Sequence, residues 1–351
     1  MLRLQHPSNP SRSNLPCRNL QPSRFPRLNA AYSISDNMDD TYRDLLIKQQ
    51  YRLCGDHAAV KLCHWMKESM LRERHCYKQD FYGIQSHRCL QMTPAINECS
   101  HRCTFCWRVQ EHDFEVKDWI EPKEMLDSLI EQQRKLVSGF KGDPRCDMKR
   151  FEEARNPNQV AISLAGEPIT YPYLSEFLKE CHSRRMTTFM VTNGTYPERL
   201  EELDVLPMQL YVTVAAPNPE VYKRVCRPKI KDGWERIMRT LELLPSLDTR
   251  TVIRHTLVKN ENFGWLDEYA ALDRIADPDM VEPKGYVFVG GSRTRLSIDC
   301  MPSFAEIRDF SGQLGERIGM SIINEREDSR VVLLGQPGME TDVRKIHGME
   351  E

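Results

Sequence analysis

Three cysteines with chemically useful spacing, Cys99, Cys103 and Cys106, form a Cys-x3-Cys-x2-Cys run. Thiolates spaced in this way on a tight loop can bind three irons of a [4Fe–4S] cube and leave the fourth iron without a protein ligand. Such an open iron can chelate the amino and carboxylate groups of S-adenosylmethionine (SAM), and an electron from the cluster then cleaves the sulfonium to a 5′-deoxyadenosyl radical. The spacing therefore predicts a radical-generating iron–sulfur centre.

Zinc is the alternative metal for these thiols. A structural zinc ion needs four ligands in a closed tetrahedron, usually from two close cysteine pairs. Here the fourth ligand would have to come from His101, His112 or a distant cysteine. Phe105, just before Cys106, favours the iron–sulfur interpretation, because an apolar cover shields the cube and tunes its potential.

A second group of cysteines lies upstream, where Cys63, Cys76 and Cys89 are separated by twelve residues each time. Buried cysteines are common in protein cores, so a structural role is one interpretation. The intervening segments are rich in His, Arg and Tyr, which favours a second cluster with an open iron. Lys78 follows Cys76 by two residues. A partly desolvated lysine near a cluster can attack a carbonyl as a neutral amine, whereas a solvated surface lysine is the plain alternative. The remaining cysteines, such as Cys226, are expected to be structural.

The elements that must position these residues alternate between strands and helices. We expect strands at 90–98, 159–165, 187–191, 209–215, 251–258 and 285–289, and helices near 122–137, 174–183, 197–204, 232–243, 264–275 and 303–318. Alternating elements with nearly continuous apolar strands predict a parallel sheet flanked by helices. Six βα units are too few for a closed eightfold barrel and suit a partial (β/α)6 TIM-like barrel, an α/β fold with its active site at the carboxyl ends of the strands.

The chain is divided into four segments by composition. Residues 1–37 are rich in Ser, Pro, Asn and Arg, and we expect a disordered leader or a true start at Met38. Residues 38–89 are expected to form a helical segment that carries the upstream cysteines. The barrel covers residues 90–335 and ends in an edge strand near 320–334, and residues 336–351 are expected to be a flexible tail.

Polar residues and glycines follow several of the expected strands. The candidate contacts for a cofactor are Gly166, Glu167, Asn193, Gly290 and Ser292. Glycine lets a ligand approach the bare backbone, and the Glu167 carboxylate can accept a hydrogen bond from an ammonium group. Each of these segments alone could be an ordinary βα turn, but the barrel argument places all of them on the rim that holds the cysteine loop.

Composition restricts the partners and the compartment. The formal net charge is −2, so a nucleic-acid partner would have to be bound by a local basic patch. Twelve cysteines without a secretory segment indicate a reducing compartment, and no apolar run approaches the ~20 residues of a membrane helix. We therefore expect a cytoplasmic protein that does not bind a membrane.

The cysteine loop, the Gly166-Glu167-Pro168 turn and the six-unit order resemble the radical-SAM superfamily. The turn motif of that superfamily is usually Gly-Gly-Glu-Pro, and Ala165 takes the place of its first glycine here. The two cysteine triads with Lys78 closely resemble the 4-demethylwyosine synthase family, over roughly residues 39–334. The similarity includes the segment 289–293 and the Arg295-Leu296 pair that follows it.

The resemblance implies a carbon–carbon lyase with two [4Fe–4S] clusters and SAM. Cys99, Cys103 and Cys106 would hold the SAM cluster, Cys63, Cys76 and Cys89 an auxiliary cluster, and Lys78 would form a Schiff base with pyruvate. The second substrate would be N1-methylguanosine beside the anticodon of phenylalanine tRNA. The radical would abstract hydrogen from its methyl group, and addition to pyruvate C2, loss of the carboxylate carbon and condensation would close a tricyclic base.

Further partners follow from the same resemblance. Eukaryotic members carry a flavodoxin-like domain, and none fits before Cys63, so we expect an archaeal-type single module. It would be a monomer that takes electrons from an external ferredoxin or flavodoxin.

Loop cations near the rim are the expected phosphate contacts for the RNA: Arg227, Lys229, Arg293 and Arg295, with Arg224 and Lys231 nearby. Two other classes of function stay open. One is a radical-SAM enzyme that acts on a peptide or small molecule, and the other is a non-catalytic zinc-binding RNA-binding protein.

Overall fold

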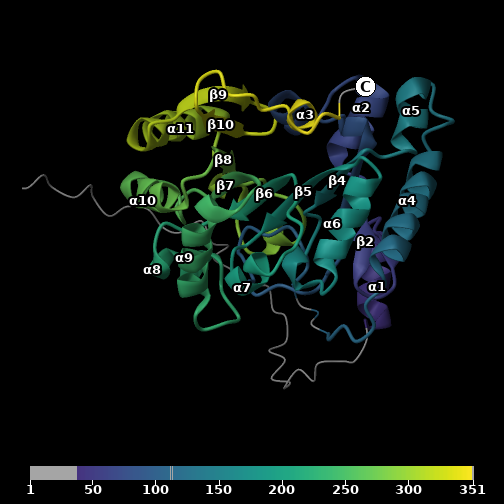
Figure 1. The fold of residues 1–351 in the computed structure, drawn as a ribbon, viewed down its shortest axis with the longest axis horizontal. Coiled ribbons are helices and arrows are strands. Elements are labelled where there is room, and N and C mark those ends of the chain that lie inside the picture. Colours follow the sequence, from purple (N-terminus) through teal and green to yellow (C-terminus); the bar gives the residue numbers. More distant parts are fainter. Residues whose placement is uncertain (1–37, 111, 113, 350–351) are drawn as a thin grey trace, which may run out of the picture.

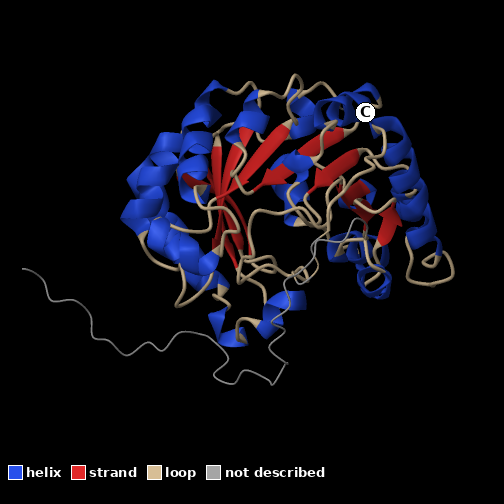
Figure 2. Ribbon diagram, turned by 90° about the horizontal axis from the view of Figure 1, so that it is seen from below, coloured by secondary structure: helices blue, strands red, loops and turns tan. Residues whose placement is uncertain are grey.

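The computed structural model describes residues 38–110, 112 and 114–349, so the predicted leader lies outside the described residues. Six consecutive parallel strands form the centre of the sheet: β3 Cys89–Thr93, β4 Gln159–Ile162, β5 Thr187–Thr192, β6 Gln209–Thr213, β7 Arg250–Leu257 and β8 Met280–Gly285. Figure 2 shows the strands as an open arc with helices along its outer side. This confirms the predicted partial α/β barrel.

Antiparallel hairpins extend the sheet at both ends. Two short strands, β1 Arg52–Cys54 and β2 Ala58–Val60, join it beside β3, and β9 Ser321–Arg326 and β10 Val331–Gly335 join it beside β8. The described residues thus form one ten-stranded sheet in the order β1-β2-β3-β4-β5-β6-β7-β8-β10-β9. The barrel does not close, because β1 and β9 are the two edges.

Helices cover the outer face of the parallel strands, as the apolar periodicity predicts. They are α4 Pro122–Ser138, α5 Met148–Ala154, α6 Leu174–Ser183, α7 Pro197–Glu201, α8 Pro219–Val225, α9 Gly233–Leu243, α10 Leu266–Ala276 and α11 Phe304–Ile318 (Figure 1). Pro122 occupies the first turn of α4, and Ser303 and Glu306 form a reciprocal capping box on α11. One core cluster joins strand residues such as Ile162 and Leu210 to helix residues such as Phe177. Strands buried on both faces explain the nearly continuous apolar runs.

The prediction of the sixth parallel strand at 285–289 is wrong, since β8 spans Met280–Gly285. Glu282, Pro283 and Lys284 gave this segment the composition of a loop. In the structure Glu282 is fully buried in an ion pair with Arg254 of β7, and this pairing makes a charged residue tolerable inside the sheet. Residues 286–289 form the loop that follows the strand.

The N-terminal segment is only partly helical. It contains α1 Asp40–Lys48, the β1–β2 hairpin, α2 His64–Arg72 and α3 Tyr77–Tyr82. Strands of three residues are too short to produce a detectable alternation, which is why the prediction missed the hairpin.

The C-terminal segment also differs from the expectation. The single edge strand near 320–334 is a β9–β10 hairpin, and Figure 1 shows it beside α3. The segment expected to be a flexible tail contains α12 Val343–Ile346, whose Val343 is fully buried among aromatic residues of α3. Among the helices that the structure describes, none has the length and hydropathy required to cross a bilayer.

Candidate active site

All six cysteines of the two predicted triads line one cavity of about 500 Å³, together with Lys78. The wall is completed by strand residues such as Ala161, Thr213 and Thr256 and by turns at the carboxyl ends of the strands, such as Gly166 and Asn193. The structure therefore brings the upstream triad and the cysteine loop to the same space, on the inner side of the parallel strands.

The cysteine loop is held from two sides by distant parts of the chain. The Thr104 amide donates to the Val225 carbonyl oxygen at 2.8 Å, and the Lys229 amide donates to the Ser100 carbonyl oxygen at 2.7 Å. On the other side, Arg295 donates to the carbonyl oxygens of Thr104 (3.2 Å) and Cys106. These contacts fix the loop backbone and so fix where its thiols emerge.

The six cysteines of the two triads are free, half-buried thiols that face the cavity. Burial raises the pKa of the Cys63 thiol to about 12, with a further contribution from Cys76, and burial raises the pKa of the Cys99 thiol to about 12. Burial also raises the pKa of Cys89, and Cys63 and Cys76 add to that shift. Thiols of this kind are protonated at neutral pH unless a metal ion replaces the proton, so the donor set fits iron–sulfur clusters.

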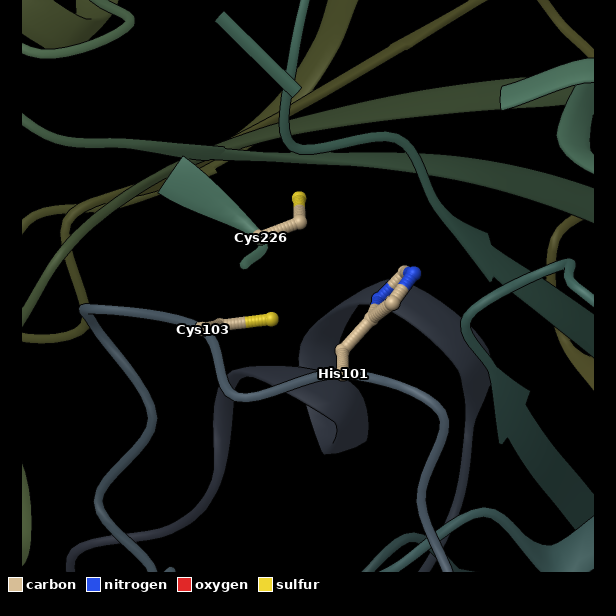
Figure 3. A group of neighbouring side chains, drawn as sticks. All are labelled: His101, Cys103 and Cys226. Atoms are coloured by element: carbon tan, nitrogen blue, oxygen red, sulfur yellow. The ribbon is translucent and has the colours of Figure 1, made fainter. Parts of the chain in front are cut away.

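A smaller group of possible metal ligands comprises His101, Cys103 and Cys226, whose ligand atoms all lie within 4.8 Å of one another (Figure 3). This group contains His101 and a distant cysteine, two of the fourth ligands considered for zinc. The sequence did not indicate that Cys226 lies near the cysteine loop. However, the Nε2 atom of His101 lies 2.7 Å from the Tyr222 hydroxyl, and burial lowers the pKa of His101 to about 4. Within the described residues no fourth ligand joins this group, so a closed zinc tetrahedron is not formed.

Glu167 has the features of a ligand-binding carboxylate. Its side chain is buried, its Oε2 accepts a hydrogen bond from the Asn193 amide at 2.7 Å, and burial raises the pKa of Glu167 to about 7. The Oε1 atom has no hydrogen-bond partner among the described residues, although Glu167 lines the cavity. A buried acceptor without a partner is costly, and an ammonium group of a bound ligand would satisfy it. The site therefore fits the amino group of SAM.

Gly166 and Asn193 support the same wall. Gly166 has a φ of +70°, and a Cβ atom there would overlap the Ala95 carbonyl oxygen. The Asn193 amide group donates to the Ser100 hydroxyl at 2.9 Å, which ties this turn to the cysteine loop.

Gly290 and Ser292 are not among the described residues that line the cavity, although the neighbouring Val289 is. A Cβ atom on Gly290 would overlap the Trp107 carbonyl oxygen, so the glycine permits close packing on the cysteine loop. Ser292 is fully buried, donates to the Val289 carbonyl oxygen at 2.6 Å and lies 2.9 Å from the Tyr286 hydroxyl. The glycine-rich turn therefore contacts protein backbone, and only its long-range fold reveals this.

Lys78 lies against aromatic rings in the cavity wall. Its ammonium nitrogen is 4.5 Å from the ring centroid of Tyr211 and 5.0 Å from that of Phe189. Burial and, to a smaller extent, the nearby Arg254 guanidinium lower the pKa of Lys78 to about 8. The environment is thus one in which a neutral amine is accessible near neutral pH.

Arg254 and Lys284 are charged residues of the cavity that the sequence interpretation missed. Arg254 forms an ion pair of 2.7 Å with Glu282 and donates to the Tyr77 hydroxyl at 3.0 Å. Lys284 lies 4.3 Å from the Tyr77 ring centroid and donates to the Ser329 carbonyl oxygen at 3.2 Å. A charged residue inside an apolar strand could have identified Arg254 as a cavity residue. The same argument was missed for Lys284, because the sixth strand was predicted at 285–289.

The predicted RNA contacts fall into two groups. Arg227, Lys229 and Arg293 are exposed, and the guanidinium of Arg293 lies 5.4 Å from the ring centroid of Phe288. Arg295 instead donates to the cysteine loop, which assigns its guanidinium to the backbone of that loop. The structure therefore gives the predicted RNA contact of Arg295 no support.

Family comparisons match most of the described chain. The model of the radical SAM superfamily matches residues 93–272, and a model described as wyosine base formation matches residues 275–336. The boundary between them lies just before β8, whose polar face lines the cavity.

Individual relatives cover the chain almost completely. An S-adenosyl-L-methionine-dependent tRNA 4-demethylwyosine synthase of Pyrococcus horikoshii is 50% identical over 319 residues, which cover 89% of this chain and 93% of that protein. The synthase of Methanocaldococcus jannaschii is 39% identical over 298 residues, covering 83% of this chain and 94% of that protein. The human synthase TYW1 is also 39% identical, but the match covers only 40% of its length.

Two solved structures share the fold. The structure of TYW1 with a lysine-pyruvate adduct bound has a TM-score of 0.80 and 36% identity, covering 87% of this chain and 99% of that chain. The crystal structure of archaeal TYW1 has a TM-score of 0.73 and 33% identity, with the same coverage.

Proposed function

Because this chain belongs to the radical SAM superfamily and, within it, to the tRNA 4-demethylwyosine synthases, we propose that it joins pyruvate to N1-methylguanosine beside the anticodon of phenylalanine tRNA. Family membership makes it an enzyme of the carbon–carbon lyase class that uses SAM and a [4Fe–4S] cluster. The observation that carries the proposal is the cavity that the six thiols of the two triads and Lys78 share.

In this proposal Cys99, Cys103 and Cys106 hold the cluster that binds SAM. When bound, the cluster and SAM supply a 5′-deoxyadenosyl radical. Glu167 accepts a hydrogen bond from the amino group of SAM through its unpartnered Oε1. The backbone amide of Asn193 holds the Glu167 carboxylate in place by donating to its Oε2. Gly166 keeps the turn close to the cysteine loop.

A second cluster on Cys63, Cys76 and Cys89 is the finer part of the proposal. These thiols lie beside one another and line the cavity together with Lys78. The cluster would supply a Lewis-acidic iron for an α-keto acid.

Lys78 is proposed to form a Schiff base with pyruvate. Its amine attacks the keto carbon, and the keto oxygen leaves as water. The aromatic rings of Tyr211 and Phe189 restrict the solvent around the amine, which favours its neutral form. A lysine–pyruvate adduct is present in a TYW1 structure that this chain resembles at 36% identity.

The tRNA would approach the rim of the cavity, where the exposed cations Arg227, Lys229 and Arg293 can contact its phosphates. The modified base has to leave the anticodon stack and enter the cavity. A cytoplasmic location, a monomeric state and an external ferredoxin or flavodoxin as the electron donor complete the proposal.

An anaerobic assay with dithionite, SAM, pyruvate and tRNA tests the proposed function. We expect a tricyclic nucleoside by mass spectrometry with N1-methylated tRNA and none with unmethylated tRNA. Formation of 5′-deoxyadenosine without any tRNA product would contradict the proposal.

Iron and sulfide analysis tests the number of clusters. We expect about eight of each per chain, falling to about four in Cys76→Ala, because each cube contains four irons and four sulfides. Cys146→Ala, a cysteine outside the cavity wall, is the matched control and should retain the full content. About four irons in the unaltered protein would reject the second cluster, and none would reject the whole scheme.

A further inference from the structure

The auxiliary side of the cavity contains three cations that share two aromatic rings. Lys78 and Arg254 both contact Tyr211, with the ammonium nitrogen at 4.5 Å and the guanidinium carbon at 4.4 Å from the ring centroid. Arg254 also donates to the hydroxyl of Tyr77, and Lys284 lies 4.3 Å from the ring centroid of Tyr77. The charges of Lys78 and Arg254 also act on Lys284, so the three cations form one group, which we call the cation cluster.

One carboxylate, Glu282, is available to balance these charges. It forms an ion pair with Arg254 through Nη2 at 2.7 Å and Nε at 3.1 Å, and it accepts a hydrogen bond from the Tyr82 hydroxyl. With Glu282 committed to Arg254, the two lysines remain unbalanced by any ion pair among the described residues. Cations in such an enclosed wall require anions, which a ligand can bring.

Lys284 is the member of the cation cluster with capacity for a ligand. Its ammonium group has three donors, and one of them is used by the Ser329 carbonyl oxygen at 3.2 Å. Its side chain reaches the cavity from β8, while Arg254 is already charge-paired. Lys78 has its own role in the proposed reaction.

We propose that Lys284 binds the carboxylate of the 2-oxo acid whose keto carbon is attacked by Lys78, and that it thereby selects 2-oxo acids over neutral ketones and aldehydes. This inference rests on the proposed function. In a 2-oxo acid the carboxylate carbon is bonded directly to the keto carbon, so the two lysines that engage them must be close together. The shared contacts of Tyr77 and Tyr211 provide that proximity, and a carboxylate held by Lys284 fixes the keto carbon beside the Lys78 amine.

Reductive trapping of the Schiff base tests the assignment without the full reaction. The anaerobically purified protein with its clusters is titrated with pyruvate in cyanoborohydride, and the stable amine on Lys78 is quantified by intact mass and peptide mapping. We expect Lys284→Met to raise the pyruvate concentration for half-maximal trapping by roughly 10- to 100-fold, the scale of a lost charge-assisted hydrogen bond. Lys284→Arg, which keeps the charge, should lie much closer to the unaltered protein.

The carboxylate itself provides the matched comparison. Methyl pyruvate has the same keto carbon without the negative charge, so Lys284→Met and the unaltered protein should trap it equally. Lys123→Met, at an exposed residue of α4, is the control for loss of a lysine and should trap pyruvate normally.

Each outcome separates the inference from the proposed function. Trapping of pyruvate at unchanged concentration in Lys284→Met would overturn the inference alone, as would equal trapping of pyruvate and its methyl ester by the unaltered protein. If Lys284→Met loses its iron, the comparison of pyruvate with methyl pyruvate in the unaltered protein tests the inference instead. No adduct on Lys78 in the unaltered protein would instead overturn the proposed function and the inference with it.

Discussion

Glu167 is the side chain that we propose binds the amino group of SAM. It is buried, one carboxylate oxygen is held by the Asn193 amide, and the other oxygen has no partner among the described residues. A single oxygen left in this state depends on a ligand donor, because a buried acceptor without a hydrogen bond destabilises the fold. The orientation of the carboxylate is therefore set before SAM arrives.

Glu167→Gln is expected to weaken SAM binding by roughly 10- to 100-fold, because a hydrogen bond from an ammonium group to a carboxylate contributes about 1.5–3 kcal/mol. Equilibrium dialysis with the cluster-loaded protein measures the affinity. Glu201→Gln, at an exposed position of α7, is the control and should bind SAM normally. Unchanged affinity in Glu167→Gln would exclude Glu167 as the amine acceptor.

Two arginines close together in the chain, Arg293 and Arg295, have different surroundings. Arg295 donates to the carbonyl oxygens of Thr104 and Cys106, whereas Arg293 is exposed beside Phe288. The short 3-10 helix Gly290–Thr294 thus exposes Arg293 to solvent, while Arg295, which follows the helix as its C-cap, meets the cysteine loop.

We expect Arg295→Met to reduce iron content at the Cys99–Cys106 site, because the loop loses two carbonyl contacts that fix its backbone. Arg293→Ala should keep its iron but bind tRNA more weakly, with the slope of log affinity against log salt reduced by about 1. Iron analysis and a salt series of tRNA binding measure both effects. The opposite pattern, iron loss in Arg293→Ala alone, would contradict this division.

At the scale of whole elements, β7 and α10 are joined by a buried pair of charges. The Nε2 atom of His255 lies 3.0 Å from the Asp273 carboxylate, and its Nδ1 lies 2.8 Å from the Val214 carbonyl oxygen. Burial alone lowers the pKa of His255, but the charge and hydrogen bond of Asp273 outweigh it, so the pKa is raised above its ordinary value of 6.5. The protonated imidazole thus links strand to helix.

A raised pKa in the folded state means that this pair stabilises the fold fully below pH 6.5 and less as the pH rises through the folded value. We expect the free energy of unfolding of the unaltered protein to fall as the pH rises above 6.5 and through the raised pKa of His255. Asp273→Asn should be destabilised most at pH 6, by about 3–5 kcal/mol, because it leaves a buried imidazolium without its anion. Guanidinium titrations at several pH values provide the measurement, and parallel pH profiles would refute the assignment.

At the scale of the whole molecule, the open sheet wraps around one cavity that two distant sets of thiols line. The thiols enter from the N-terminal segment and from the loop after β3, while the cation cluster comes from α3, β7 and β8. Thiols with a raised pKa bind metal only after losing their protons, so bound metal would hold the two sets of cysteines together across the cavity. The clusters are therefore expected to stabilise the fold as well as to supply its chemistry.

Removal of the clusters by ferricyanide and a chelator should lower the thermal midpoint by at least about 5 °C, because bound metal stabilises the folded state alone. Anaerobic calorimetry of the loaded and stripped protein measures the change, and reconstitution with iron and sulfide should restore it. Equal midpoints would show that the cavity is stable without metal.

Local patterns were sufficient for the parts of this protein that depend on neighbouring residues. The spacing of Cys99, Cys103 and Cys106 predicts a cluster loop because a short run of chain can place all three thiols. Helix boundaries such as Pro122 and Ser303 follow from capping chemistry within a single turn. The regular alternation of strands and helices in turn predicts the partial barrel.

Only the tertiary structure shows the contacts between segments that are far apart in the sequence. Arg254 and Glu282 form an ion pair 28 residues apart, and this pairing is what allows the charged segment 280–285 to be a central strand. Arg295 meets the cysteine loop across 189 residues, which no local pattern indicates. Contacts of this range exist only after the sheet has curved, so the roles of Arg295, Gly290 and Lys284 depend on the completed fold. The spacing of the three cysteines, in contrast, can be read from a few neighbouring residues, although distant segments hold the loop in place.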